Sequence, residues 1–115
     1  METLLTETCV PCQGNLPPIS DAEMSELMPQ IPDWDIVKEN GENHLQRSYQ
    51  FADFKSALTF TNRVGEEAEK AGHHPALLTE WGKVTVTWWT HAINGLHRND
   101  FVMAAKTDEA FRTSH

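Results

Sequence analysis

The chain has 115 residues, of which 39% are hydrophobic and 23% are charged, and its formal net charge is −8. This length fits one domain with a core, and the acidic balance disfavours direct binding to the phosphates of nucleic acids. No run approaches the ~18 apolar residues of a membrane span. The N-terminus "METLLTETCV" carries glutamates where an export signal would carry lysines, so we expect a cytoplasmic protein.

The first 19 residues are predicted to form an irregular leader before a single domain at residues 20–115, because prolines are concentrated near the N-terminus. The leader contains Cys9 and Cys12 in a C-x-x-C pattern. A cytoplasmic setting disfavours a structural disulfide, and one cysteine pair is half of a usual zinc site. A pair without function and a pair with metal or redox behaviour both remain open interpretations.

The domain is predicted to open with a short helix within "SDAEMSELMPQ", residues 20–30. Ser20 is a plausible N-cap, Glu23 completes a capping box, and Pro29 ends the helix. A hairpin follows in "WDIVKENGENHLQRSYQF", residues 34–51, because Asn40-Gly41 is a strong hairpin signal. Its second strand alternates Leu45, Arg47, Tyr49 and Phe51 on one face.

A longer helix is predicted between Asp53, which can cap it, and Gly72, which suits the left-handed position just past its end. Pro75 prevents its continuation. Apolar or small residues recur every three or four positions and predict the buried face. They are Phe54, Ala57, Leu58, Thr61, Val64, Ala68 and Ala71.

A second hairpin is predicted from "ALLTEW" (76–81) and "KVTVTWWT" (83–90), with Gly82 as the bend. Residues 91–100 are predicted as a loop, with Asn99 or Asp100 capping a last helix that uses Phe101, Ala104, Ala105 and Asp108. The order is helix, two strands, helix, two strands, helix. It predicts an α+β fold in which helices pack on one face of a four-stranded antiparallel sheet.

The second hairpin also predicts where several histidines meet. His73 and His91 each stand nine positions from Gly82, so they should lie at the same open end of the hairpin, with His74 beside them. A looser turn would shift this register by a residue or two. Asp100, after a short loop, can reach the same end.

Such a cluster has three interpretations. It can be a solvated group without a role, a metal site, or a centre for proton transfer without metal. Adjacent residues such as His73 and His74 rarely both face one ion, and the helical H-E-x-x-H spacing is absent. Spacing alone leaves the metal and acid–base interpretations open.

The residues around the cluster, and their spacing, resemble the signature of a known family. "EKAGHHP" is followed by Trp81 after five residues, by His91 after nine more and by Asp100 after eight more. This pattern resembles the signature of the pterin-4a-carbinolamine dehydratases, and the resemblance runs from about residue 20 to residue 111. "LLTEWGKVTVTWW" and "GLHRNDF" are similar to bacterial members.

The resemblance implies a dehydratase, a hydro-lyase that converts 4a-hydroxytetrahydropterin to quinonoid dihydropterin and water. It implies histidine acid–base catalysis with no metal and no organic cofactor. The reaction recycles the pterin of aromatic amino acid hydroxylases, which makes phenylalanine hydroxylase a candidate partner, and the family forms homodimers or homotetramers. The alternative is a regulatory module that binds a hydroxylase or acts on transcription, since animal relatives are dimerisation partners of a homeodomain transcription factor.

Carried over by residue, the resemblance makes His73, His74 and His91 the active-site imidazoles. We expect His73 and His91 to be the acid–base pair and His74 to contact substrate or share in proton transfer. Asp100 matches the acidic position that orients an imidazole, and a plain helix cap is its alternative role.

The remaining signature positions carry weaker expectations. Pro75, Thr90 and Ala92 are expected to line the pterin site. Trp81 matches an aromatic position, but its place near the bend favours packing over stacking on the pterin. Glu69, one turn before His73, is expected on a solvated helix face, and the additional His97 is expected to be exposed.

Overall fold

The computed structural model describes residues 4, 19–90, 93 and 95–113. In it the protein consists of a four-stranded antiparallel sheet with helices on one face. The helices are α1 (Asp21–Leu27), α2 (Phe54–Ala71) and α3 (Arg98–Thr113), and a 3-10 turn spans Met28–Gln30. The strands are β1 (Asp35–Glu39), β2 (Glu42–Gln50), β3 (Ala76–Glu80) and β4 (Lys83–Trp88). The predicted α+β order is therefore confirmed.

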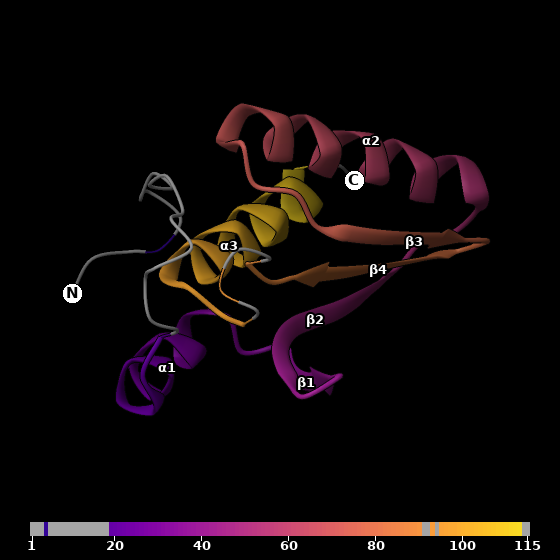
Figure 1. Ribbon diagram of the computed structural model, residues 1–115. Coiled ribbons are helices and arrows are strands. Elements are labelled where there is room, and N and C mark those ends of the chain that lie inside the picture. Colours follow the sequence, from indigo (N-terminus) through magenta and orange to yellow (C-terminus); the bar gives the residue numbers. More distant parts are fainter. Residues whose placement is uncertain (1–3, 5–18, 91–92, 94, 114–115) are drawn as a thin grey trace.

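The strands lie in the order β1-β2-β4-β3. In Figure 1, α2 runs along β3 and β4, α3 lies beside it, and α1 lies near the start of α3. Both long helices contact the same face of the sheet, because Thr61 of α2 bonds Thr79 and Asp108 of α3 bonds Tyr49. The core lies between this face and the two helices, and Tyr49, Phe60, Trp88 and Phe101 are its largest buried side chains.

The first hairpin forms where it was predicted. Asn40 and Gly41 both have positive φ, 53° and 81°, and they connect the pair Glu39–Glu42. Two central residues with positive φ match the type I′ turn, whose twist suits a two-residue hairpin. The strand face predicted from alternation is also confirmed at Leu45 and Tyr49, which are buried.

The second hairpin differs from its prediction by one residue. Glu80 pairs with Lys83 and Ala76 with Thr87, so the loop is Trp81-Gly82 rather than a bend centred on Gly82. Gly82 has a φ of 73°, and a Cβ there would meet the carbonyl oxygen of Phe51 at 3.1 Å. Extended to the open end of the hairpin, this register sets Thr90 opposite His73.

The predicted ends of α2 are confirmed. The Asp53 side chain accepts a hydrogen bond from the Ser56 amide at 2.8 Å, and Gly72 ends the helix in the left-handed conformation at φ 65°. Asp53 is fully exposed, and the hydrogen bond from Ser56 lowers the pKa of its carboxyl group.

The buried face of α2 is narrower than predicted. Ala57, Val64 and Ala68 are buried as expected, and Phe60 joins them. Phe54 and Leu58 are 44% and 43% exposed, so their inclusion in the core was wrong. The buried residues follow a stripe with spacings of three and four, which turns the other two side chains away from the sheet.

The first helix is capped as predicted, because the Ser20 hydroxyl accepts a hydrogen bond from the Glu23 amide at 3.1 Å. The Glu23 carboxylate pairs with Arg98 at 3.0 Å instead of completing a capping box. Leu4 is buried, and its amide donates to the Gln30 side chain. The rest of the leader up to residue 18, including Cys9 and Cys12, lies outside the described residues, so its irregular structure stays a prediction.

Candidate active site

The end of α2 positions the two adjacent histidines, His73 and His74. Gly72 stops the helix in the left-handed conformation, and the His73 amide still donates to the Ala68 carbonyl at 3.2 Å. β3 begins at Ala76, so the whole connection between helix and strand is residues 72–75, with His73, His74 and the half-buried Pro75 following Gly72. A connection this short fixes the backbone that carries both imidazoles.

Asp100 is the centre of the site, and its side chain is fully buried. One oxygen, Oδ1, accepts a hydrogen bond from His73 Nε2 at 2.6 Å. The other, Oδ2, accepts from the Thr90 hydroxyl at 2.8 Å and from the His97 amide at 2.9 Å. The carboxylate lies in the first turn of α3, where the helix dipole favours negative charge. The predicted approach of His73 and Asp100 is therefore observed.

These contacts fix the orientation of the His73 ring. A carboxylate only accepts hydrogen bonds, so Nε2 of His73 donates and Nδ1 is the nitrogen left to exchange a proton. The ring is parallel to Trp88, with an interplanar angle of 7° and 5.6 Å between centroids. The His73 side chain is 10% exposed. An imidazole held this way can orient one nitrogen toward a ligand.

His74 has a different environment from its neighbour. Its Nε2 lies 2.6 Å from Glu69 Oε1, and the two side chains are 61% and 78% exposed. Glu69 is therefore on a solvated helix face, as expected, and its carboxylate reaches the second histidine. Water and salt screen a pair this exposed, so its geometry is held less firmly than that of His73 and Asp100.

The start of α3 corrects two expectations. The helix begins at Arg98, so the residue at the cap is His97, and neither Asn99 nor Asp100 fills that position. His97 Nδ1 accepts a hydrogen bond from the Asn99 amide at 3.1 Å. His97 is half-buried rather than exposed, because its ring closes this turn.

The other predicted residues have different positions. Thr90 is buried, and its hydroxyl points at Asp100. Trp81 lies in the two-residue hairpin loop, 75% exposed and at the opposite end of the hairpin from His73. His91 and Ala92 lie outside the described residues, so the predicted meeting of His73 with His91 stays a prediction.

Sequence reasoning missed the contacts of Trp88 and Thr90 with the site. Trp88 was predicted only as part of the strand at residues 83–90, and Thr90 was named for substrate contact rather than for binding Asp100. The corrected hairpin register would have found the second contact, because it sets Thr90 opposite His73. Backbone bonds between Thr90 and Gly95, 2.8 and 3.4 Å long, then lead the chain toward α3.

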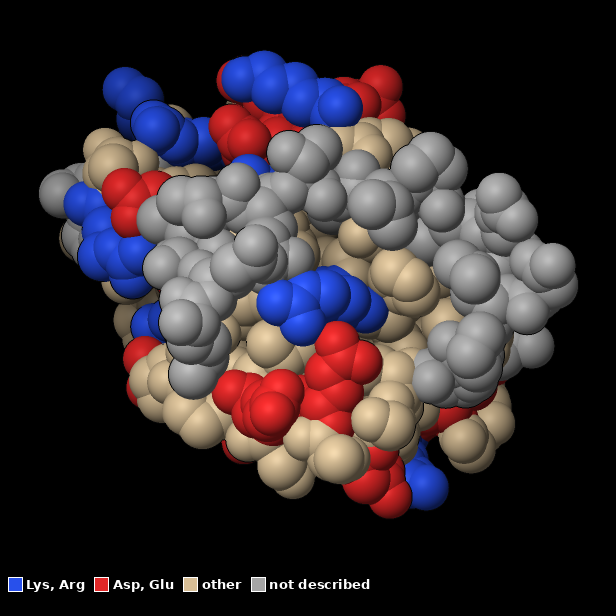
Figure 2. Space-filling model, turned by 90° about the vertical axis from the view of Figure 1, so that its left-hand side faces the viewer, with Lys and Arg blue, Asp and Glu red and all other residues tan. Residues whose placement is uncertain are grey.

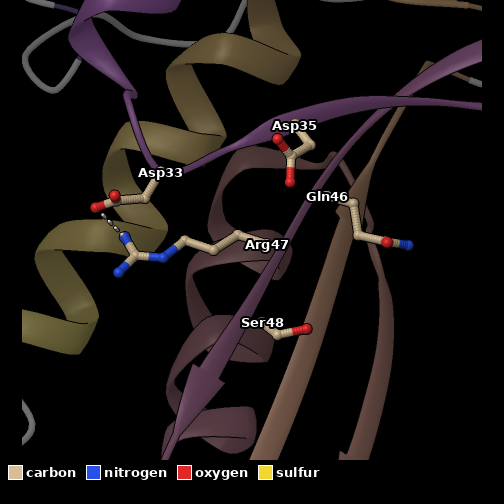
Figure 3. A pocket seen from close by; sticks show the side chains of 5 residues that line it. All are labelled: Asp33, Asp35, Gln46, Arg47 and Ser48. Atoms are coloured by element: carbon tan, nitrogen blue, oxygen red, sulfur yellow. Dashed lines mark ion pairs between the residues drawn. The ribbon is translucent and has the colours of Figure 1, made fainter.

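A surface pocket of about 410 Å³ lies elsewhere, along β2 beside the start of β1. Figure 3 shows its lining residues, with Arg47 reaching toward Asp33. Arg47 is already paired with Asp108 at 2.6 Å and with Asp33 at 3.6 Å. Its charge is neutralised by the protein's own carboxylates, so the pocket does not offer an anion site.

On the face shown in Figure 2, acidic and basic side chains are interspersed. Among the described residues, no group of three or more His, Cys, Asp and Glu side chains is arranged to hold a metal ion. In the same part of the chain, no helix is long and apolar enough to cross a membrane.

The sequence matches the family model for pterin 4 alpha carbinolamine dehydratase over residues 17–110. The chain belongs to this family. Proteins provisionally named pterin-4-alpha-carbinolamine dehydratases from Nitrosococcus oceani and Microcystis aeruginosa are each 54% identical to it over 112 residues. These alignments cover 97% of this chain and 99% and 97% of the two relatives, so the similarity spans nearly full length. The family is one of dehydratases, which are hydro-lyases.

Two solved structures share the fold. A transcriptional coactivator/pterin dehydratase from Brucella melitensis is 32% identical, with a TM-score of 0.73, covering 81% of this chain and 97% of that one. A pterin dehydratase-like protein identified as a RuBisCO assembly factor in the alpha-carboxysome has a TM-score of 0.58 at 18% identity. Its alignment covers 68% of this chain and 88% of that one, and at this identity it supports the fold alone.

Proposed function

We propose that the protein dehydrates a 4a-hydroxytetrahydropterin to quinonoid dihydropterin and water. The C4a–O bond breaks as the leaving hydroxide takes up a proton and departs as water. The N5 lone pair forms the new C4a=N5 bond, and the N5 proton is then removed. Atoms and charge balance with one acid and one base, and positioned acid–base groups typically contribute about 10²–10⁴-fold.

The observation that carries the proposal is the buried His73–Asp100 pair in a chain of this family. Asp100 holds Nε2 of His73, so Nδ1 is the atom that exchanges a proton with the pterin. The neutral ring accepts a proton there, and the protonated ring donates it back. The parallel indole of Trp88 and the buried carboxylate prevent the ring from turning away from this orientation.

We assign His91 as the second member of the acid–base pair and His74 as a contact to the substrate that can share in proton transfer. Pro75, Thr90 and Ala92 complete the proposed lining. Support for His74 comes from its exposure next to His73 and from its own carboxylate partner, Glu69. The reaction as proposed uses neither a metal nor an organic cofactor.

In the cell, this activity would recycle the pterin of an aromatic amino acid hydroxylase in the cytoplasm. We propose phenylalanine hydroxylase as the enzyme served, and a homodimer or homotetramer as the working assembly. The domain would comprise residues 20–115, with residues 1–19 as a leader.

A direct assay tests the activity. A hydroxylase reaction supplies the 4a-carbinolamine, and the decay of its absorbance is followed with and without the folded protein. We expect a clear acceleration over buffer, and its absence would reject the proposal.

A double variant tests the assigned pair. His73→Ala combined with His91→Ala should keep the fold, as judged by circular dichroism, and lose most of the activity. Normal turnover by this variant would refute the assignment of these two residues.

A second candidate is a regulatory role through protein contacts, supported by the words "transcriptional coactivator" in the name of the Brucella melitensis structure. This role would require a stable complex with phenylalanine hydroxylase or with a transcription factor. Light scattering of the mixed, purified proteins would detect the hydroxylase complex. Two separate species at micromolar concentrations would argue against that partner.

A further inference from the structure

The first turn of α3 is closed by two reciprocal hydrogen bonds. The Asn99 amide donates to the His97 ring at Nδ1, 3.1 Å away, and the His97 amide donates to Asp100 Oδ2 at 2.9 Å. This is the pattern of a capping box in which an imidazole replaces the usual hydroxyl. A backbone N–H only donates, so Nδ1 carries a lone pair and the neutral ring holds its proton on Nε2.

The cap shares its carboxylate with the candidate active site. Asp100 accepts the His97 amide on one oxygen and His73 Nε2 on the other, 2.6 Å away. A shift in the first turn of α3 therefore moves the group that orients His73. Because all of these contacts converge on one buried side chain, the cap and the imidazole are mechanically coupled.

Contacts from α1 and from the segment just before it flank His97 on both sides. The amide of Ile19, two residues before the helix, donates to the Leu96 carbonyl at 2.8 Å, and the side chain of Glu23 in α1 pairs with the side chain of Arg98 at 3.0 Å. The backbone before the cap and the side chain after it are thus attached to the N-terminal part of the domain. The His97 ring then completes the turn between these two attachments.

We propose that His97 is a positioning residue of the reaction centre, and that its unprotonated Nδ1 holds the first turn of α3 so that Asp100 stays on His73. This inference rests on the proposed function. His97 acts only through Asp100, so its loss should lower kcat more than it raises KM. The same cap makes the geometry of the site sensitive to acid, since protonation of His97 at Nδ1 removes the acceptor of the Asn99 amide.

Several charged groups surround this cap in the described part of the chain. Arg98 and Asp100 lie on α3 itself, Glu23 reaches over from α1, and His73 approaches from the end of α2. A proton on His97 would place a cation near Arg98 and next to the carboxylate that His73 uses. Both effects would weaken the hold of Asp100 on His73.

Three variants test the role by kinetics. His97→Ala removes the cap, while His97→Ser and His97→Asn keep a capping side chain that does not titrate. We expect kcat to fall about three- to tenfold in His97→Ala, with KM within about twofold, and to return to near wild type in the other two. In His97→Ser, kcat should persist further toward acid pH than in wild type.

Nuclear magnetic resonance of the ring nitrogens gives a readout that does not need activity. His97, identified by the signals missing in His97→Ser, should show the tautomer with its proton on Nε2. The titration of His73 should shift in His97→Ala and return in His97→Ser. If wild type lacks dehydratase activity, the proposed function fails, whereas these signals still decide the coupling.

Specific outcomes would overturn the inference. A proton on Nδ1 of His97 at neutral pH would do so, as would a His73 titration unchanged in His97→Ala. If His97→Ala does not fold, the comparison of wild type with His97→Ser decides alone. If kcat then declined at the same acid pH in wild type and in His97→Ser, the proposed response to acid would be rejected.

Discussion

Helix α3 carries two buried carboxylates whose partners differ in chemistry. Asp100, in the first turn, accepts hydrogen bonds from His73, Thr90 and the His97 amide. Asp108, two turns later, accepts three donors on Oδ1: the Trp34 indole, the Arg47 guanidinium and the Tyr49 hydroxyl. Both are satisfied, and among the described residues no buried side-chain polar atom lacks a partner.

The difference lies in whether the partner can release a proton. Arg47 stays charged at every relevant pH, and it also lies over the Tyr49 ring at 4.3 Å, so its pairing with Asp108 is static. An imidazole, unlike a guanidinium, can gain and lose a proton, so the pairing of His73 with Asp100 is of a kind that can support proton transfer. One helix therefore contributes the same residue type to stability at one position and, by our proposal, to catalysis at the other.

The largest expected effect is on stability at the static cluster. Asp108→Asn leaves the half-buried Arg47 with Asp33 as its only carboxylate partner among the ion pairs of the described residues, at 3.6 Å and with a mostly exposed carboxylate. We expect the free energy of unfolding to fall by about 3 kcal/mol, because the buried partner of a largely desolvated ion pair is removed. Urea denaturation followed by tryptophan fluorescence measures this, and kcat of the folded variant should be unchanged.

The matched control is Asp33→Asn, which removes only the exposed partner of Arg47. Its cost should stay at or below about 1 kcal/mol. Equal effects of the two substitutions would show that Asp108 has no special role in the cluster.

The next effect is on activity at Asp100. Asp100→Asn places an amide N–H₂ group against the donors that Asp100 now accepts from, which include His73 and Thr90. It therefore disturbs the tautomer of His73. We expect kcat to fall about 10²-fold, within the range of positioned acid–base groups, and stability to fall by about 1–3 kcal/mol. Steady-state kinetics and urea denaturation measure the two losses. Wild-type kcat in this variant would remove the distinction drawn between the two carboxylates.

A smaller effect is expected at Tyr49. Burial, followed by the negative charge of Asp108, raises the pKa of Tyr49 well above its ordinary value. The phenol therefore stays protonated in the folded state, whereas the unfolded chain ionises near pH 10. The contribution of Tyr49 to folding stability is therefore complete below pH 10. It declines as pH rises above 10, because only the unfolded state then gains the negative charge.

Tyr49→Phe should remove this alkaline contribution. We expect a cost of about 1.5 kcal/mol at pH 7 for the lost hydrogen bond to Asp108. Above pH 10 the stability of the variant should decline less steeply than that of wild type. Urea denaturation from pH 7 to pH 11 gives both results, and parallel curves would contradict the pKa direction.

The smallest effect is expected at the exposed pair of His74 and Glu69, which serves as the contrast to both buried carboxylates. Glu69→Gln should change kcat/KM less than about fivefold, since exposed pairs contribute about 1 kcal/mol or less. Raising the salt concentration should shrink the difference further. A loss as large as that of Asp100→Asn would mean that solvent exposure does not separate the two histidine–carboxylate pairs.

Local signals in the chain predicted most of the fold. Asn40-Gly41 predicted a turn with two positive φ angles, and Gly72 predicted the end of a helix in the left-handed conformation. These features depend on the conformational preferences of a few adjacent residues, so they can be inferred without knowing the rest of the molecule. The capping serine and aspartate, Ser20 and Asp53, were predicted for the same reason.

The candidate site was predicted less completely. His73 and Asp100 were expected to approach each other, from the hairpin and from the family signature. The one-residue register error hid the contact of Thr90 with Asp100, because register depends on which loop residues turn the chain. The stack of His73 on Trp88 also escaped prediction, since it depends on the packing of a loop against a strand.

The sequence by itself determined the order of the elements, their caps and turns, and the family to which the chain belongs. Each of these rests on neighbouring residues or on the spacing of the signature residues along the chain. Only the tertiary structure decided that Asp100 faces His73, that Asp108 faces Arg47, and that His97 caps α3. The first two pairings join residues 27 and 61 positions apart. The partner of a buried carboxylate is fixed by how helices and strands pack, which short-range preferences leave unspecified.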